Sequence, residues 1–529
     1  MTKAAPTPLR LIGNPSENFY ILGKKHYSQF RQLQSIISPR PESWANRLKN
    51  LSQTIRAKKS VSVPQGPWEE WLNSYCEGLE IPVLNYLAFM DDIEKNSLAG
   101  GALPGCTSVF LWNDDHQRAE HLRLLDWPMS LASEQHCELI LLHVPHQQAL
   151  LMVCVPGLPF LPLTIMNESG VTLALHAKYH ALNHPDGTPI GQIAMESMLE
   201  ARSTQELKKL LKRYQTKRLW GLHGCDPSGL VLALDVMGPQ MDGQNFNIQE
   251  EKILVFNNAP LVKDQPNQVS AEPPAFLYFC KERRRFRLER LKTKSEDHSL
   301  VQLTRAHKAS KFRAPAVTLS CLQAMSFHPS SRRFELLLGT PPMWAQGELA
   351  AWNDLFTTSM RQPEVLELSQ SKEEKQEWLT RKELSDAQKA MDLGDIALAF
   401  HHIQMGLVKA QGELKQQAAW VWAWWQWQHL SGKRDRMQLP SFVREVMKAS
   451  HGQQPHLKFL LFLLEVELEL AATVSPPDLP TPFREWADAY LVAPTVRRLQ
   501  MIHVPQARLD IQDCLPLIIP TWTKASWPG

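Results

Sequence analysis

Residues 105–128 read GCTSVFLWNDDHQRAEHLRLLDWP, which predicts a strand, a polar turn and a returning apolar segment. The stretch just before it, SLAGGALPG at residues 97–105, contains two adjacent glycines and ends in Pro104-Gly105. Such a segment favours an exposed turn, where a chain can be cut without removing a core element. We therefore expect Cys106 to begin a strand directly after an accessible loop.

A cysteine at this point can attack the carbonyl carbon of the residue before it. The Gly105–Cys106 amide would become a thioester, and its hydrolysis would free the α-amine of Cys106. A free α-amine has a reference pKa near 7.7–8.0. A neutral amine would therefore be present near neutral pH to act as general base for the adjacent thiol. The alternative is a buried cysteine with a purely structural role.

Two charged residues, Arg123 and Asp126, return toward Cys106 after the turn. The Asp126 carboxylate would bind and orient the α-amine, and the Arg123 guanidinium would lower the pKa of the thiol. The alternative for this R-x-x-D pair is a surface ion pair, which is common and contributes little to stability.

The rest of the first 345 residues predicts helices followed by strands. Apolar residues recur at helical spacing between residues 16 and 100. Short runs rich in Val, Ile and Leu follow, namely TSVFLW, ELILLHV, ALLMVCV, VTLALHA, LVLALDV and KILVF. Ser203 precedes Glu206 by three residues, which is typical of a helix N-terminus. A further helix is expected over 282–293, and a hairpin over 322–339. The pattern indicates a layered α+β fold with sheets covered by helices.

Beyond residue 345 the pattern becomes helical. Residues 385–411 and 416–430 predict paired helices, with Gly394 as a break or cap, and residues 456–472 predict another helix. The predicted domains are 1–105, 106–345, a helical and loosely repeat-like 346–475, and a proline-rich 476–529. Tryptophans at five positions of one run favour a helical core, with a ligand surface as the alternative (Trp420, Trp422, Trp424, Trp425 and Trp427).

Composition argues against several classes of function. The 529-residue chain carries a net charge of +3, which gives no reason to expect nucleic acid as a partner. It has no run of 18 apolar residues, no signal-peptide pattern and no phosphate-binding glycine loop, so we expect a cytoplasmic protein without a membrane span. The eight cysteines form no CxxC pair. His143, His146 and His176 lack metal-ligand spacing, and we predict neither a metal nor a cofactor.

Residues 105–128, GCTSVFLWNDDHQRAEHLRLLDWP, resemble the nucleophile region of the acyl-coenzyme A:6-aminopenicillanic acid acyltransferase family. This family is related to choloylglycine hydrolases and acid ceramidase, within the N-terminal-nucleophile hydrolases. Four later segments resemble the family's segments in the same order, so the similarity covers about residues 16–345: MNESGVTLALH at 166–176, GTPIGQIAMESMLEARSTQELKKLL at 187–211, ILVFNNAPL at 253–261 and LQAMSFHPSSRRFELLLGTPP at 322–342.

The resemblance implies a four-layer αββα sandwich, self-cleaved between Gly105 and Cys106, with a C-terminal helical domain outside the family core. Cys106 matches the nucleophile, and Arg123 and Asp126 match the charged pair beside it. Asn258 matches the asparagine that donates to the oxyanion. Asn167 matches a turn asparagine, for which a purely structural β-turn is the alternative. The implied activity is hydrolysis of a linear amide in a small molecule or peptide, with acyl transfer also open.

Two positions depart from the family. Asn257-Asn258-Ala259 stands where the family has threonine, asparagine and histidine, and His176 stands where a small polar residue or asparagine is commoner. Arg284 and Arg287 are better explained as a solvated helix face than as site residues. The departures keep a second hypothesis open, namely a catalytically inactive scaffold whose C-terminal helical domain binds a protein partner.

Overall fold

The computed structural model describes most of the chain up to residue 411 and scattered parts beyond it. The described residues are 5–37, 67–99, 105–126, 137–178, 184, 187–258, 261, 299–300, 321–338, 348–353, 355–357, 362–367, 372–411, 415, 418–419, 421–422, 425, 462, 478, 483–492, 502–503 and 519–520. Those up to residue 367 form one compact unit, and those from residue 372 onward belong to a second.

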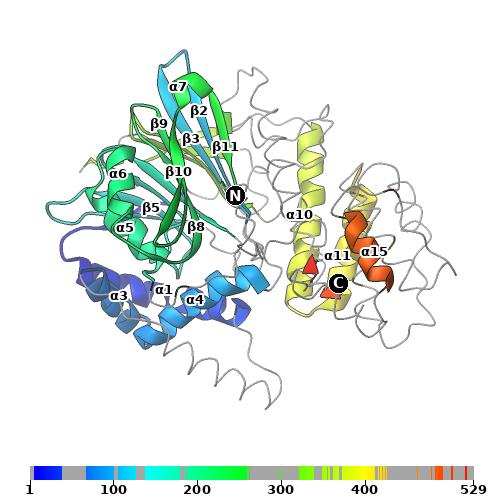
Figure 1. Cartoon of the computed structure of the whole chain (residues 1–529). Helices are drawn as coiled ribbons and strands as arrows, with labels where there is room; N and C mark the ends of the chain where they lie inside the picture. The colour runs from blue at the N-terminus through cyan, green and yellow to red at the C-terminus, as the bar shows by residue number, and fades with distance from the viewer. Residues whose placement is uncertain are drawn as a thin grey trace. The chain divides into compact units, whose positions relative to one another are not determined.

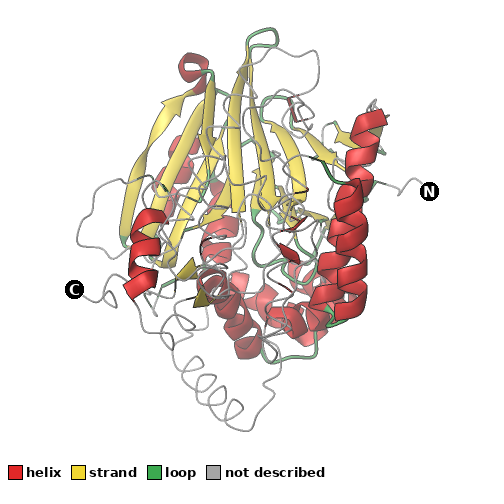
Figure 2. Ribbon diagram, turned by 90° about the vertical axis from the view of Figure 1, so that its right-hand side faces the viewer, coloured by secondary structure: helices red, strands yellow, loops and turns green. Residues whose placement is uncertain are grey.

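The first unit contains an eight-stranded sheet in the order β1-β4-β5-β6-β7-β8-β9-β10 (Figures 1 and 2). Its neighbouring strands are antiparallel except for the parallel pair β1–β4. Nearly all side chains of β4 to β7 are buried, as expected when both faces of a sheet are covered. The strands are β1 (Leu9–Leu11), β4 (Glu138–Leu142), β5 (Leu150–Cys154), β6 (Thr164–Asn167), β7 (Thr172–Ala177), β8 (Thr216–Cys225), β9 (Leu230–Gly238) and β10 (Gln240–Asn247).

The second sheet of this unit has seven antiparallel strands in the order β11-β2-β3-β12-β13-β14-β15. The hairpin expected at residues 105–128 lies inside this sheet, flanked by β11 and β12. The strands are β2 (Gly105–Asn113), β3 (Arg118–Asp126), β11 (Ile253–Phe256), β12 (Cys321–His328), β13 (Arg333–Leu337), β14 (Glu348–Trp352) and β15 (Glu364–Glu367).

The two sheets face each other through an apolar core. Leu139 and Leu151 of the eight-stranded sheet share one buried cluster with Met325, Phe327 and Trp352 of the seven-stranded sheet. Because side chains alternate between the faces of a strand, the intervening residues of the eight-stranded sheet point the other way. They form a second cluster with helices. In the described part of this unit, the helices therefore lie on one side of the eight-stranded sheet and the seven-stranded sheet lies on the other.

Those helices cover the outer face of the eight-stranded sheet (Figure 1). Ser203 caps α6 as expected, since its side chain accepts a hydrogen bond from the backbone N–H of Glu206 at 3.2 Å. The helices of the first unit are α1 (Pro15–Ile37), α3 (Pro67–Gly78), α4 (Val83–Ala99), α5 (Ile190–Glu200), α6 (Thr204–Leu211) and the short α7 (Ile248–Glu251), of which α7 lies outside that cluster.

Helices α1 and α3 meet backbone to backbone at two glycines. A Cβ atom on Gly23 would lie 2.2 Å from the carbonyl oxygen of Tyr75, and one on Gly78 would lie 2.1 Å from that of Tyr20. Both distances are far below van der Waals contact, so only glycine fits at either position.

A buried histidine links this helix pair to the eight-stranded sheet. His26 in α1 lies 2.9 Å from the Tyr75 hydroxyl and 2.6 Å from Oε2 of Glu138 in β4. Burial opposes ionisation of Glu138, but hydrogen bonds from His26 and Lys25 outweigh it and lower the pKa of this carboxyl. The described residues 5–37 and 67–99 are therefore part of the first unit and share its core.

The mixed α+β architecture is confirmed, with two sheets and several helices, but the seven-stranded sheet continues past the expected boundary at residue 345. β14 and β15 lie beyond it, and their sequences ELAAW and EVLE lack the β-branched runs that indicate strands. β1, with three residues, and the polar edge strand β10 were also not predicted. The helix expected at 282–293 lies outside the described residues, and the four-layer arrangement stays a prediction.

The described residues of the second unit include α10 (Lys372–Asp392), α11 (Ile396–Lys409) and α15 (Phe483–Val492), with a short pair β16 (Ile502–His503) and β17 (Ile519–Pro520). Gly394 ends the helical conformation between α10 and α11 with a φ of +79°, as expected.

Two of the five tryptophans are described, and both are core residues of the second unit. Trp422 and Trp425 are buried beside Phe400, with ring centroids 6.0 and 6.2 Å from its ring. Trp420, Trp424 and Trp427 lie outside the described residues. Across the described parts of both units, no helix has the length and apolar character that a membrane crossing requires.

Candidate active site

Cys106 lies at the start of β2, on the face that points toward the eight-stranded sheet. Its Cα pairs with Leu125 of β3, and the preceding Gly105 pairs with Asp126. The Cys106 side chain is 2% exposed. The cross-strand register therefore brings the Gly105–Cys106 peptide bond beside the end of β3, where the sequence predicted its charged partner. The side chain of Asp126 lies outside the described part of the chain.

Asn258 holds the backbone nitrogen of Cys106 across 152 positions of sequence. The Cys106 N–H donates to Asn258 Oδ1 at 2.6 Å, and Asn258 Nδ2 donates to the carbonyl oxygen of Ala177 at 2.8 Å. The two contacts fix the orientation of the amide, because the N–H needs the oxygen and the carbonyl needs the nitrogen. Asn258 follows β11, the neighbour of β2, and this adjacency brings the two residues together.

Arg123 is fully buried between the two sheets. It pairs with Ser108 across the β2–β3 hairpin, so both side chains lie two residues along the strands from the Cys106 pair. Its guanidinium donates to the carbonyl oxygen of Leu175 at 2.7 Å and to Nε2 of His176 at 2.8 Å. A surface ion pair therefore does not describe Arg123.

A chain of polar side chains continues from Arg123 across the sheet interface. Ser108 Oγ lies 2.9 Å from His176 Nε2 and 3.0 Å from His121 Nε2, and His121 Nδ1 lies 2.9 Å from Thr172 Oγ1. Arginine can only donate, so His176 Nε2 is an acceptor and Ser108 must donate to it. Ser108 then accepts from His121 Nε2–H, which leaves His121 Nδ1 as an acceptor facing the Thr172 hydroxyl. That hydroxyl has a second acceptor within reach, the carbonyl oxygen of Cys225 at 3.2 Å. Both imidazoles are neutral in this arrangement.

The electrostatics agree with neutral histidines. Burial lowers the pKa of His121, His176 and His223 well below the ordinary value, and the charge of Arg123 lowers it further. His223 lies against His176, with ring centroids 4.3 Å apart, and neither of its nitrogens has a hydrogen-bond partner among the described residues.

A second buried cation follows β7. Lys178 Nζ donates to the carbonyl oxygen of Asn257 at 2.8 Å and lies 3.4 Å from Oδ1 of Asp235 in β9. Lys178 therefore ties the residue before Asn258 to the eight-stranded sheet. It fixes the segment that carries Asn258 rather than contacting Cys106 in any described interaction.

Asn167 has a different set of partners. Its Nδ2 donates to the carbonyl oxygens of Met198 and Ala201, at 3.0 and 2.6 Å, and its Oδ1 accepts from the N–H of Val171 at 2.9 Å. These bonds close the β6–β7 turn and hold the end of α5. Such a full set of backbone partners is typical of a structural asparagine.

The structure thus brings together Cys106, Arg123 and Asn258, and adds residues that the sequence analysis did not select. The sequence carried one usable signal for them, because Cys106 and Ser108 share a strand face, as do His121 and Arg123. Residues on β7 to β9 gave no such signal, since nothing in one sequence says which strands face each other. The added residues are Ser108, His121, Thr172, Lys178, His223 and Asp235. Arg284 and Arg287 lie outside the described residues.

Comparison with known proteins identifies no residue of this site. No family model matches the chain, and no curated protein matches it. Among solved structures, the chain is similar to penicillin V acylase from Agrobacterium tumefaciens, with 9% sequence identity and a TM-score of 0.31, over 50% of this chain and 100% of that chain.

Proposed function

We propose that this chain is a self-processing cysteine N-terminal-nucleophile amidohydrolase that cleaves linear amides. The observation that carries the proposal is the 2.6 Å hydrogen bond from the Cys106 backbone nitrogen to Asn258 Oδ1. After cleavage this nitrogen would become the α-amine that serves as general base, so Asn258 would hold the base from the start. A mixed α+β unit with two facing sheets is compatible with the αββα sandwich that we propose for it.

Self-cleavage would proceed without another reagent except water. The Cys106 thiol attacks the carbonyl carbon of Gly105, the thiol proton moves to the Cys106 nitrogen, and the C–N bond breaks. Water then adds to the resulting thioester and the C–S bond breaks, which leaves a Gly105 carboxylate and a free thiol. The pairing of Gly105 with Asp126 in the strand register supports a role for the Asp126 carboxylate in orienting the new α-amine.

Amide hydrolysis would use the same atoms. The neutral α-amine, with one N–H held by Asn258, keeps its lone pair for the thiol proton. Sulfur attacks the acyl carbon, the ammonium protonates the leaving amine, and water releases the acid from the thioester. In this scheme Asn258 is primarily a positioning residue for the base. Its second Nδ2 hydrogen and backbone N–H groups are the candidate donors to the oxyanion.

A second function is supported by a specific observation. The Arg123 guanidinium, which the enzyme would use to lower the pKa of the Cys106 thiol, is bound instead to His176 and to the carbonyl oxygen of Leu175. This arrangement suits a sandwich that serves as a scaffold, with the helical second unit as its partner-binding part.

The two functions differ in the fate of the Gly105–Cys106 bond. Purified chain would be incubated, separated on a denaturing gel and sequenced from the new N-terminus. The enzyme predicts a larger fragment beginning at Cys106 and release of free amine from N-acyl amino acids or peptides. Cys106→Ala would abolish both, whereas the matched variant Cys137→Ala would retain both. An intact wild-type chain that hydrolyses no amide would leave the scaffold as the function.

A further inference from the structure

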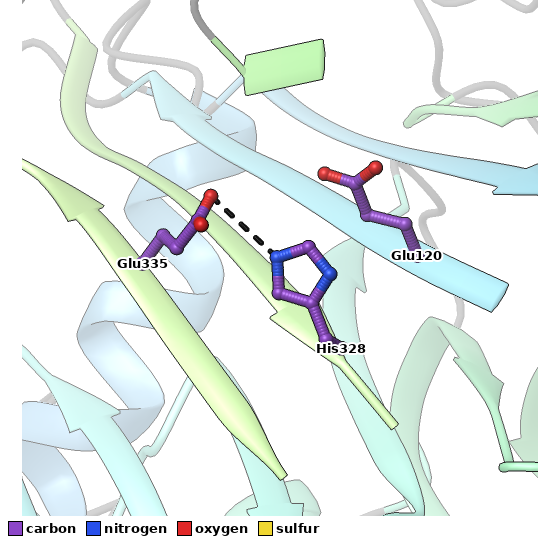
Figure 3. A group of neighbouring side chains, drawn as sticks. All are labelled: Glu120, His328 and Glu335. Carbon is purple, nitrogen blue, oxygen red and sulfur yellow. Dashed lines mark ion pairs between the residues drawn. The ribbon is translucent and has the colours of Figure 1, made fainter. Parts of the chain in front are cut away.

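One histidine and two glutamate side chains converge on the face of the seven-stranded sheet that points away from Arg123. Arg123 and His121 of β3 face the eight-stranded sheet, so the alternate residue Glu120 faces outward. Met325 and Phe327 of β12 lie in the core between the sheets, so the next residue, His328, faces outward. Phe334 of β13 also lies in that core, so Glu335 faces outward as well. Because β3, β12 and β13 are neighbours, the three outward side chains meet (Figure 3).

The donor atoms of this Glu120–His328–Glu335 cluster are close enough to share one ion. One ligand atom from each residue lies within 4.8 Å of the others. His328 Nε2 lies 3.5 Å from Glu335 Oε2. Two ligands about 2.0–2.1 Å from a tetrahedral ion are separated by roughly 3.3–3.4 Å. The spacing of this pair therefore matches two ligands on one metal better than it matches a direct hydrogen bond of about 2.7–3.2 Å.

The imidazole lacks good partners among the described residues. His328 is only 5% exposed, and its Nδ1 has no hydrogen-bond partner. Its Nε2 has two long contacts, to Glu335 and to Ser326 Oγ at 3.4 Å. Nε2, the atom that faces Glu335, therefore has no described contact shorter than 3.4 Å, and a ligand at an ordinary bonding distance would satisfy it better.

The charges also favour a cation. Glu120 and Glu335 are 5% and 2% exposed, and Arg333 is the paired cation, with 2.8 and 2.9 Å contacts to Glu335 Oε1. Ser326 donates to Glu120 Oε1 at 2.7 Å and carries no charge. Two carboxyl groups therefore face one guanidinium in this buried cluster, and burying charge without a counter-ion is costly.

We propose that Glu120, His328 and Glu335 bind one divalent first-row transition-metal ion, with zinc as the representative. One imidazole and two carboxylates form a three-residue donor set of the type that zinc accepts, with a further position for water. The imidazole disfavours Mg²⁺ and Ca²⁺, which prefer oxygen ligands. The ion would join β3, β12 and β13 on the face opposite Arg123. This proposal does not depend on the function proposed for Cys106.

Calorimetric titration of the full chain with ZnCl₂, after dialysis against a chelator, tests the site. We expect the wild-type chain to bind one equivalent of zinc at this site. His328→Gln should bind that equivalent at least about 100-fold more weakly. The matched control is Glu138→Gln, which alters the other buried histidine–glutamate pair and should retain wild-type affinity. The cysteine thiols are the same in wild type, His328→Gln and Glu138→Gln. Zinc bound by these thiols therefore does not affect the comparison.

A variant with the opposite effect guards against misfolding. Arg333→Gln removes the cation that competes for Glu335 and should tighten zinc binding by about tenfold. Loss of structure does not produce tighter binding. The proposal would be overturned if folded His328→Gln bound zinc as tightly as wild type, or if wild type bound no more zinc than His328→Gln does. His328 would then serve only as a side-chain contact of Glu335.

Discussion

The guanidinium of Arg123 in the seven-stranded sheet donates to Nε2 of His176 in the eight-stranded sheet at 2.8 Å. This bond crosses the interface between the two sheets, two residues along the hairpin from the Cys106 pair. Because arginine stays protonated, the bond also fixes His176 as a neutral acceptor. His176, one of the two departures from the family that the sequence resembles, is therefore a structural connection between the sheets.

Under the proposed function, Asn258→Asp should change the pH dependence of amide hydrolysis. A carboxylate beside the α-amine of Cys106 would favour the ammonium form and raise the pKa of the amine by about one unit. The rate at pH 7 would fall about tenfold and recover above pH 8 to 9. Asn258→Ala is the control, since it removes the hydrogen bond without adding charge and should slow turnover at every pH. Identical pH profiles for the two variants would contradict the positioning role.

Asn167→Asp should affect folding rather than chemistry. The carboxylate cannot donate to the carbonyl oxygens of Met198 and Ala201, and we expect the free energy of unfolding to fall by about 3 kcal/mol or more. Denaturant unfolding measures this change. The kcat of the folded fraction should stay within about twofold of wild type, and a large fall in kcat with unchanged stability would assign Asn167 to catalysis instead.

The free energy of unfolding should fall steeply as the pH drops below about 6.5. The folded-state pKa values of His121, His176 and His223 are lowered by burial and by Arg123, with Lys178 adding to this at His176 and His223. In acid the unfolded chain therefore binds up to three protons that the folded chain does not. Stability is then lost by about 4 kcal/mol per pH unit, an effect absent above the unfolded pKa. Urea unfolding between pH 5 and 8 measures the slope.

His223→Met isolates one of these three groups. Neither nitrogen of His223 has a hydrogen-bond partner among the described residues, so an apolar side chain of similar size should leave stability at pH 7 equal or higher. The acid slope should become about one-third shallower, because one buried base is gone. A slope equal to that of wild type would mean that His223 is protonated in the folded chain or already neutral in the unfolded one.

Gly23→Ala should destabilise the first unit by about 1–3 kcal/mol or more, because the new methyl group would overlap the carbonyl oxygen of Tyr75 in α3. Ser28→Ala is the matched control, since it introduces the same residue at an exposed position of the same helix. Thermal unfolding of the two variants gives the comparison. Equal melting temperatures would show that α1 and α3 can separate without cost.

Much of the first unit follows from local pattern. The runs at β4, β5, β7 and β9 are rich in Val, Ile and Leu and bounded by turn residues, and each forms a strand as expected. Ser203 carries a local signal for a helix start in this unit, Gly394 carries one for a helix end in the second unit, and both are confirmed. β14 and β15 carry no such signal, because pairing rather than their own composition determines them: β14 pairs with β13, and β15 pairs with β14.

The amino-acid sequence alone determined that Cys106 lies at the start of a strand and has Arg123 on the returning strand, since these relations depend on neighbours in the chain. The loop predicted at residues 97–105 is corrected at both ends, because α4 continues to Ala99 and β2 begins at Gly105, and residues 100–104 lie outside the described residues. Tertiary structure alone decided that Asn258 meets the Cys106 nitrogen, that His176 engages Arg123, and that Glu120 meets His328 and Glu335. Each of these contacts joins residues 53 to 215 positions apart. They depend on which strands become neighbours and which faces oppose, and those choices come from burial of the whole core rather than from any local pattern.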